Sequence, residues 1–291
     1  MESVKGIFAA LVTPFDENNE INDKALEEII KMNIDKGIDG FYVGGSTGEV
    51  FLLSFEERKH VLDVVCGTAK GKCKIISHIG CTSTDMAIEL GKYAVKKQVD
   101  AISALPPTYY KFSFDEIFGY YNDISKSIDL PLLIYNFPAF SGVNLSIGQF
   151  KMLLENPKIA GLKSSSFDLF MLERLKSSFP DKAMLNGHDE VFLSSLIAGA
   201  DGAIGSTFNI MVEKFLKIRS LYNDGRLDEA KTVQSKANKV IELLLDMGII
   251  PGIKEILNCM NIKCGYCRRP FSKVDVSKHK NNIKTIMELL A

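Results

Sequence analysis

Ile159-Ala160-Gly161-Leu162-Lys163-Ser164-Ser165-Ser166 is a short apolar segment that ends in one lysine and is followed at once by serines. An apolar run of this length indicates a buried strand with Lys163 at its end. Burial disfavours a charged ammonium, and a neutral amine in a pocket is a nucleophile for a carbonyl carbon. The other interpretation is a lysine whose charged end leaves the strand and reaches water. The stretch by itself leaves both interpretations open.

Eight apolar segments of this kind recur along the chain, and a helical pattern follows each of them. Helix starts are marked by capping residues, such as Ser54 with Glu57 three positions later. Sustained alternation of strand and helix favours a parallel sheet with helices outside. Eight units of this length favour a closed (β/α)8 TIM barrel, with an open doubly wound sheet as the alternative. The expected strands are residues 6–12, 40–43, 74–79, 101–105, 132–135, 159–163, 183–185 and 202–205.

The chain beyond about residue 210 has a helical pattern throughout, including residues 228–246, 251–260 and 277–290. We expect residues 1–210 to form the barrel core that carries the active site. Residues 211–291 are then a C-terminal helical extension that packs on the barrel and includes its last helix. No low-complexity linker separates the two parts, so we expect one structural domain overall.

The composition is that of a soluble globular protein. The chain has 291 residues, 46% of them hydrophobic and 24% charged, with a formal net charge of −1. This balance argues against a nucleic-acid-binding surface, which needs a clustered basic excess. No run approaches the roughly 18 apolar residues of a membrane helix, and the N-terminus lacks the plan of a signal peptide. We therefore expect a cytoplasmic protein with neither a nucleic-acid nor a membrane partner.

The six cysteines are scattered, which is typical of reduced thiols in the cytosol rather than of a disulfide framework. Cys264 and Cys267 have the spacing of a metal or redox pair, but no second pair or histidine cluster accompanies them. His78 and His188 also lack a partner at metal-ligand spacing. The spacing of these residues therefore argues against a metal or redox site.

Polar residues follow most of the expected strands. In a TIM barrel the active site lies at the carboxyl ends of the strands, so these residues would converge at one mouth. Their convergence favours a catalytic role for Lys163 over a solvated one. The residues at these ends are Thr13, 44–47, 108–110, Tyr135, Lys163, 187–190 and 206–207.

Three of these features keep an ordinary interpretation beside the functional one. Residues 44–48, Gly-Gly-Ser-Thr-Gly, suit a carboxylate ligand but also a capped glycine-rich turn, and they lack the ending of a P-loop. Tyr135 is either a proton shuttle or a strand-end aromatic residue. Asp189 and Glu190 either complement a helix N-terminus or hold sugar hydroxyls.

Residues 44–49, Tyr135–Pro138 and Gly161–Lys163 together resemble the N-acetylneuraminate lyase/dihydrodipicolinate synthase family of class I aldolases. The resemblance covers nearly the whole chain. It implies a (β/α)8 barrel with a C-terminal helical extension, usually a homotetramer, and no metal or organic cofactor. It also implies that Lys163 forms a Schiff base with the keto carbon of a small-molecule substrate, and that Tyr135 donates and accepts protons.

The resemblance assigns the remaining predicted site residues as well. Ser46 and Thr47 would hold the pyruvyl carboxylate and take part in a proton relay. One of Tyr109 and Tyr110 would complete that relay, the second acting in the neighbouring subunit's site.

Substrate choice within the family turns on a few positions. Dihydrodipicolinate synthases typically carry an arginine two residues after the proline of the tyrosine motif, where this chain has Phe140. The motif instead looks like that of the sialic acid lyase branch, which implies retro-aldol cleavage of a sialic acid to pyruvate and N-acetylmannosamine. The residues expected to accept the hydroxyls of the open-chain polyol are Ser165, Gly187, Asp189, Glu190 and Ser206.

Three positions depart from the branch pattern and bear on fine substrate preference. His188 stands where a tyrosine or phenylalanine is commoner, Pro106 replaces a threonine, and Ser165 lacks a threonine's methyl group. The alternatives on the same lysine are a dihydrodipicolinate synthase and a 2-keto-3-deoxy sugar acid aldolase. An alternative of another class is a non-catalytic barrel that binds a keto acid.

Overall fold

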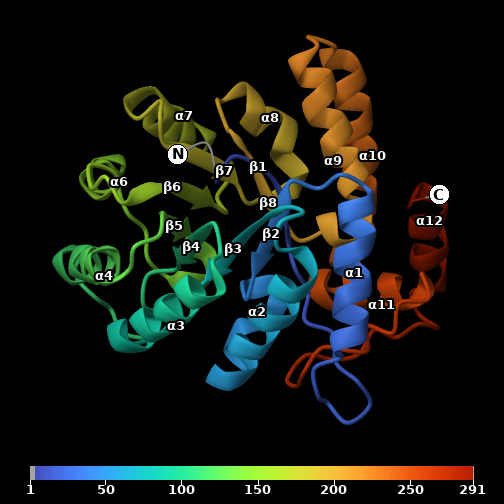
Figure 1. Cartoon of the computed structure of the whole chain (residues 1–291). Helices are drawn as coiled ribbons and strands as arrows, with labels where there is room; N and C mark the ends of the chain where they lie inside the picture. The colour runs from blue at the N-terminus through green and yellow to red at the C-terminus, as the bar shows by residue number, and fades with distance from the viewer. Residues whose placement is uncertain (1–3, 291) are drawn as a thin grey trace. The chain divides into compact units, whose positions relative to one another are not determined.

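The computed structural model describes residues 4–290 and shows a closed barrel of eight parallel strands in the order β1 to β8, with helices between them (Figure 1). This confirms the predicted (β/α)8 TIM barrel and excludes the open sheet. The strands are β1 (Gly6–Ala10), β2 (Gly40–Val43), β3 (Lys74–His78), β4 (Ala101–Ala104), β5 (Leu132–Asn136), β6 (Ile159–Ser164), β7 (Ala183–Asn186) and β8 (Gly202–Gly205).

The helices begin where the sequence places capping residues. Ser54, Ser113 and Ser146 each accept a backbone N–H three residues on, while the side chain at that third position returns to the backbone N–H of the serine. These reciprocal bonds satisfy donors that the first turn of a helix leaves unpaired. The helices are α1 (Asp23–Asp35), α2 (Phe55–Ala69), α3 (Thr84–Lys97), α4 (Phe114–Ser127), α5 (Pro138–Ser141), α6 (Ile147–Leu154), α7 (Leu169–Ser178), α8 (Phe192–Ile197), α9 (Phe208–Asn223), α10 (Leu227–Met247), α11 (Ile249–Cys259) and α12 (Lys280–Leu290).

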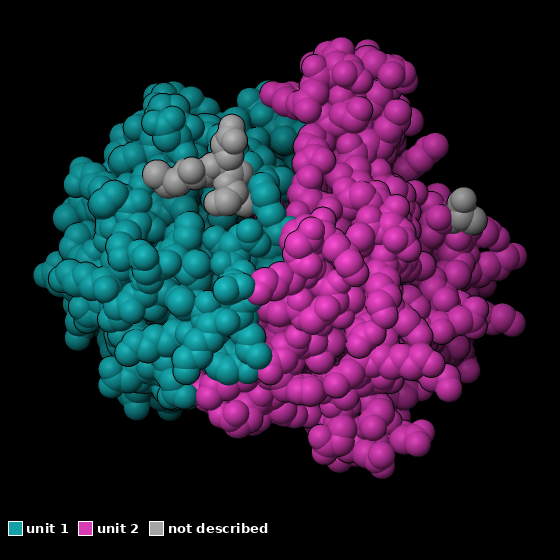
Figure 2. Space-filling model, viewed as in Figure 1, with its two compact units in different colours: residues 1–6, 74–204 teal, residues 7–73, 205–291 magenta. Residues whose placement is uncertain are grey.

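The chain divides into two compact units, which Figure 2 colours separately. One unit joins the N-terminus up to Gly6 with Lys74–Ile204, and it contains β3 to β7 with helices α3 to α8. The other joins Ile7–Cys73 with Gly205–Ala291, and it contains β2, α1, α2 and the helices from α9 onward. The expected boundary near residue 210, within one structural domain, stays a prediction.

The strands β5 and β6 are buried along their whole length, as their apolar sequences require. A side chain at Gly161 would bring its Cβ to 1.9 Å from the carbonyl oxygen of Ala183 on β7. Its φ of +157° is also in a region that L-residues rarely adopt. Only glycine lets β6 and β7 approach this closely, which explains why Gly161 stands inside the apolar run.

The C-terminal part departs from the sequence prediction in one respect. The helices α9 and α10 lie side by side (Figure 1), but residues 261–279 contain no helix. The side chain of Asn258 bonds both the N–H and the carbonyl of Gly265, whose φ is +68°, so the backbone turns instead of continuing the helix. The expected helices 228–246, 251–260 and 277–290 are confirmed as α10, α11 and α12, while the expectation of helix throughout this part was wrong for residues 261–279. No helix among residues 4–290 is long and apolar enough to cross a membrane.

Candidate active site

Lys163 and Tyr135 occupy adjacent positions on neighbouring parallel strands. The register pairs Tyr135 of β5 with Lys163 of β6, so both side chains leave the sheet at the same level. The two residues are 2% and 3% exposed, respectively. The Nζ atom of Lys163 lies 3.8 Å from the centroid of the Tyr135 ring. The structure therefore brings the predicted amine and phenol together in a buried place, one residue before the end of β6.

Hydroxyl and amide groups surround this pair at the strand ends. Asn136, the last residue of β5, donates from Nδ2 to the Ser164 hydroxyl at 3.2 Å. The backbone N–H of Ser165 donates to the Asn136 carbonyl at 2.8 Å, and Ser165 is buried. The edge of the His78 ring, from β3, packs against Tyr135 with centroids 5.9 Å apart. These contacts fix the backbone that follows Lys163 and the ring that lies beside it.

The turn after β7 packs directly against the chain that follows β6. The N–H of Gly187 donates to the Ser164 carbonyl at 2.8 Å, and the Ser165 hydroxyl lies 3.4 Å from the Gly187 carbonyl. A Cβ at Gly187 would lie 2.2 Å from that hydroxyl oxygen. The predicted polyol residues Ser165 and Gly187 are thus in contact, and the contact requires the absence of a side chain at 187.

The acidic pair follows in the same turn. Asp189 is buried at the start of a short 3-10 helix (Asp189–Val191), and Glu190 is half-buried with Oε1 3.4 Å from Nδ1 of His188. Burial raises the pKa of the Glu190 carboxyl, but hydrogen bonds from His188 and the backbone outweigh it, so the net pKa lies below its usual range. The His188 ring stacks on Phe167, with centroids 4.3 Å apart.

Aromatic rings continue from Tyr135 into the turn after β5. Phe137 stacks with Tyr135, with centroids 5.8 Å apart, and contacts Phe140 at 4.3 Å. Phe140 lies in the short helix α5 and is 72% exposed. An apolar ring cannot pair with a carboxylate, so the structure offers no cation at the position where Phe140 stands.

Tyr109 and Tyr110 lie in the loop between β4 and α4 and are 89% and 69% exposed. Their rings meet edge to face, with centroids 5.1 Å apart. Tyr109 has a φ of +83°, which is uncommon for a residue other than glycine. Their part in a proton relay stays a prediction.

Ser46, Thr47 and Ser206 belong to the second unit. Residues 46–48 form one turn of 3-10 helix, which Gly44 and Gly45 separate from the end of β2. Thr47 is buried, and its hydroxyl oxygen lies 2.7 Å from that of Ser206, while Ser46 is half-buried. The Thr13 hydroxyl donates to the Gly48 carbonyl at 2.8 Å. Within this unit the structure brings together hydroxyl groups that the sequence places 159 residues apart.

Two buried polar residues of this unit were not among the predicted site residues. Asn209 donates from Nδ2 to the carbonyls of Ala10 and Ser206, both at 2.7 Å, and its Oδ1 accepts from the Val12 N–H. Asn209 is fully buried, and a polar side chain inside the apolar start of α9 was the signal for it. The second is Glu49, which ends the glycine-rich loop with a buried carboxylate.

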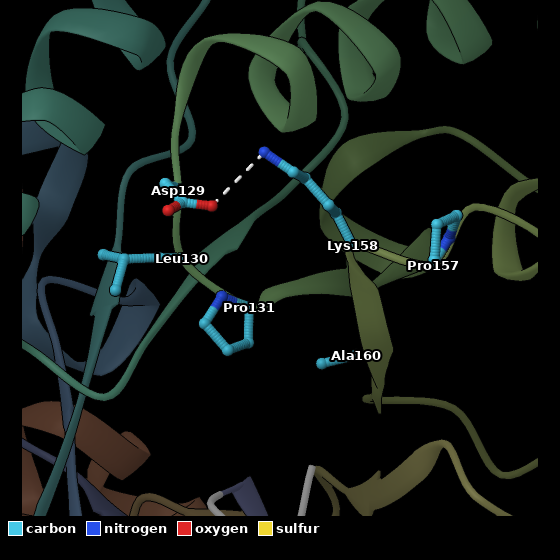
Figure 3. A pocket seen from close by; sticks show the side chains of 6 residues that line it. All are labelled: Asp129, Leu130, Pro131, Pro157, Lys158 and Ala160. Atoms are coloured by element: carbon cyan, nitrogen blue, oxygen red, sulfur yellow. Dashed lines mark ion pairs between the residues drawn. The ribbon is translucent and has the colours of Figure 1, made fainter.

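A separate hollow of about 230 Å³ opens at the amino ends of β5 and β6 (Figure 3). Lys158 reaches across it towards Asp129, with 3.5 Å between Nζ and Oδ1. The other residues that line the hollow are Leu130, Pro131, Pro157 and Ala160. None of the predicted site residues lines it, and the amino ends of barrel strands serve stability rather than chemistry.

No group of three or more His, Cys, Asp or Glu side chains within residues 4–290 has the arrangement of a metal site. The thiols of Cys264 and Cys267 are not joined in a disulfide. Burial raises the pKa of both to about 12, so they stay protonated at neutral pH.

The chain belongs to the dihydrodipicolinate synthetase family, whose model matches residues 3–289. The N-acetylneuraminate lyase of Escherichia coli strain SMS-3-5 is 42% identical to it over 290 residues, which is 99% of this chain and 97% of the relative. The solved structure of CdNal from Clostridium difficile in complex with mannosamine matches with a TM-score of 0.96 at 40% identity, covering 99% of both chains. N-acetylneuraminate lyase from Fusobacterium nucleatum complexed with pyruvate matches with a TM-score of 0.91 at 41% identity, covering 98% of this chain and 95% of that one.

Proposed function

We propose that this chain cleaves N-acetylneuraminate reversibly to N-acetylmannosamine and pyruvate through a Schiff base on Lys163. The observation that carries the proposal is the buried Lys163 amine at 3.8 Å from the ring of Tyr135. Binding a keto acid requires neither a buried amine nor a phenol beside it, whereas imine chemistry uses both. The identity of 42% to N-acetylneuraminate lyase over 99% of the chain supports the choice of substrate.

The Lys163 amine adds to the C2 ketone of the open-chain sugar acid, and loss of water gives a protonated imine. Tyr135 removes the C4 hydroxyl proton through the substrate's own carboxylate. The C3–C4 bond then breaks, its electron pair flows into the iminium, and N-acetylmannosamine leaves as the aldehyde. Protonation of the enamine at C3 and addition of water release pyruvate and the free amine. The iminium is the electron sink, so the reaction needs neither a metal nor an organic cofactor.

The hydroxyls of Ser46 and Thr47 hold the carboxylate next to the ketone, and Ser206 supports Thr47 at 2.7 Å. Tyr109 or Tyr110 completes the proton relay, one of them in the neighbouring subunit's site of a homotetramer. The exposure of both phenols in the single chain, 89% and 69%, supports this assignment, because exposed aromatic rings are favoured at subunit interfaces. Sedimentation of the purified protein tests the tetramer, and a monomer contradicts it.

The polyol end of the substrate bonds to Ser165, Gly187, Asp189, Glu190 and Ser206. The direct contact of Ser165 with Gly187, and the position of Asp189 and Glu190 in the same turn, support this role. Carboxylates accept hydrogen bonds from sugar hydroxyls, and the lowered pKa of Glu190 keeps it in the accepting form at neutral pH. The proposal places the reaction in the cytoplasm, consistent with thiols that are not cross-linked.

Trapping with borohydride in the presence of pyruvate tests the imine. We expect one reduced pyruvyl adduct, located on Lys163 by peptide mass spectrometry and absent in Lys163→Met. The matched control is Lys182→Met, since Lys182 is also buried and burial lowers its pKa, but its Nζ bonds to backbone carbonyls. An adduct that persists in Lys163→Met, or none in the unaltered protein, contradicts the proposal.

A comparative assay tests the substrate. Pyruvate release from N-acetylneuraminate is expected, with no condensation of pyruvate and aspartate semialdehyde, because Phe140 offers that substrate's carboxylate no cation. The opposite result identifies a dihydrodipicolinate synthase. Release of pyruvate only from a 2-keto-3-deoxy sugar acid identifies the other aldolase, and release from no substrate supports the non-catalytic barrel.

A further inference from the structure

A buried ion pair lies directly behind the loop that carries Ser46 and Thr47. Glu49 follows this loop, and its Oε1 lies 2.5 Å from Nζ of Lys254 on α11. The two side chains are 0% and 1% exposed. The Lys254 Nζ also donates to the Tyr266 carbonyl at 3.1 Å and lies 4.3 Å from the centroid of the Phe15 ring. Removing two charges from water is costly, and their attraction offsets that cost only where the geometry is good and further hydrogen bonds satisfy the pair.

Arg268 holds the same loop from a second direction. Its backbone N–H donates to Oε2 of Glu49 at 2.8 Å, and its guanidinium donates to the Leu52 carbonyl at 3.0 Å. The guanidinium also bonds both carboxylate oxygens of Glu57 on α2. Arg268 therefore bonds to both ends of the short 3-10 helix Val50–Leu52 that follows the loop, at its N-cap Glu49 and at its last residue Leu52.

The contacts of Lys254 and Arg268 hold Glu49 in an unusual backbone conformation. Glu49 has a φ of 59° and a ψ of 35°, the left-handed conformation that residues other than glycine seldom adopt. In this conformation its N–H donates to the Ser46 carbonyl at 3.0 Å and closes the turn Ser46–Gly48. A disfavoured conformation persists only when the surrounding structure determines it, and here the carboxylate of Glu49 is fixed at both oxygens.

We propose that Lys254 and Arg268 are positioning residues for the Ser46–Thr47 loop, acting through the buried carboxylate of Glu49. They set the direction of the Thr47 hydroxyl, which lies 2.7 Å from that of Ser206 and holds the pyruvyl carboxylate in the function proposed above. Lys254 and Arg268 thus affect substrate binding without contacting the substrate. They act as outer residues that orient the side chains which bind it.

The test is a comparison of Lys254→Met with Thr47→Ala and with the double variant. The readout is the pyruvate concentration that gives half-maximal borohydride adduct on Lys163, measured well below the Tm of each variant. We expect Lys254→Met alone to raise this concentration about 10-fold, within the range seen for outer-shell residues. In the Thr47→Ala background we expect a further rise of less than about 2-fold, because the hydroxyl that Lys254 positions is already absent.

Equal fold-changes in both backgrounds, or none in either, overturn the positioning role, since a purely structural defect acts independently of Thr47. Glu49→Gln combined with Lys254→Met removes both charges at similar volume, and it replaces Lys254→Met if the single variant does not fold. The matched control is Arg219→Met, which breaks an ion pair with Asp39 near the amino end of β2 in the same unit and should leave the readout unchanged. Unaltered protein that forms the adduct but cleaves no N-acetylneuraminate refutes the proposed substrate and leaves this comparison valid.

Discussion

Three buried lysines show how the partner of an amine decides its chemistry. Lys254 is paired with a carboxylate, and Lys182 donates to the carbonyls of Asn156 and Ile159. Lys163 lies against the ring of Tyr135 at the end of a strand. All three are at most 8% exposed, so burial alone does not distinguish a nucleophile from a structural cation. The ion pair of Lys254 and the carbonyl contacts of Lys182 are structural, whereas Lys163 lies beside a phenol at a strand end, which is the arrangement that imine chemistry uses.

Removing the phenol hydroxyl of Tyr135 tests proton transfer separately from imine formation. Tyr135→Phe keeps the ring at Lys163 and removes only the hydroxyl. We expect kcat for N-acetylneuraminate cleavage to fall by about 10²-fold to 10⁴-fold, the usual contribution of a positioned acid or base. Trapping of pyruvate on Lys163 should persist, because the ring packing is kept. A variant with unchanged kcat would assign the proton to another group.

At the scale of elements, the ends of β5, β6 and β7 bring the polar groups of the first unit together through their register. Tyr135 pairs with Lys163, and Ser164 pairs with Asn136 on one side and Asn186 on the other. The turn after β7 then lies against Ser165 through Gly187. The position of each polar group therefore depends on two strands, and a change in one turn moves groups that follow the neighbouring strand.

Gly187→Ala tests this dependence. The added Cβ would lie 2.2 Å from the Ser165 hydroxyl, so Ser165 or the turn has to move, and overpacking of this kind costs about 1–3 kcal/mol. We expect KM for N-acetylneuraminate to rise about 10-fold, equivalent to about 1.4 kcal/mol, with pyruvate trapping unchanged.

Gly148→Ala is the control for this substitution, because the new Cβ on α6 meets nothing closer than 3.8 Å. It should leave KM as it is and slightly raise the Tm, since alanine favours a helix. An equal rise of KM in both variants would contradict the contact between Ser165 and Gly187 as the cause.

At the scale of the whole molecule, the sequence was informative where the determining contacts are local or repeated. Ser54 and Glu57 predict their helix start from three residues of separation, and the run 159–163 predicts β6 to within one residue. Because the carboxyl ends of the strands of a TIM barrel meet at one mouth, Tyr135 and Lys163 could be expected at the same site before their distance was known.

The contacts that the sequence did not reveal join distant residues. Arg268 and Glu49 are 219 positions apart, and neither has a local pattern that distinguishes it from a solvated charge. The short helix α5 and the positive φ of Tyr109 were not predicted either, because they depend on the loops around them. Burial of a charged pair is a property of the folded chain, so it requires the structure.

Arg268 and Glu57 join the C-terminal segment to α2, and their pair predicts a specific loss of stability in acid. Hydrogen bonds from Arg268 lower the pKa of the Glu57 carboxyl to about 2, against the opposing effect of burial. A pKa that is lower in the folded state contributes stability above the unfolded value of 4.5, and this contribution is lost as the pH falls towards 2. Because the pair is only partly buried and water screens it, we expect a contribution of about 1 kcal/mol.

Glu57→Gln should therefore lower the Tm at pH 7 by about 2 °C, and the difference from the unaltered protein should close as the pH falls below 4.5. Thermal unfolding followed by circular dichroism between pH 7 and pH 3 measures this difference. Glu229→Gln is the control, since the pair of Glu229 with Arg226 lies on the surface and should contribute less at every pH. A difference for Glu57→Gln that stays constant down to pH 3 would show that Arg268 holds α2 by contacts other than the charge of Glu57.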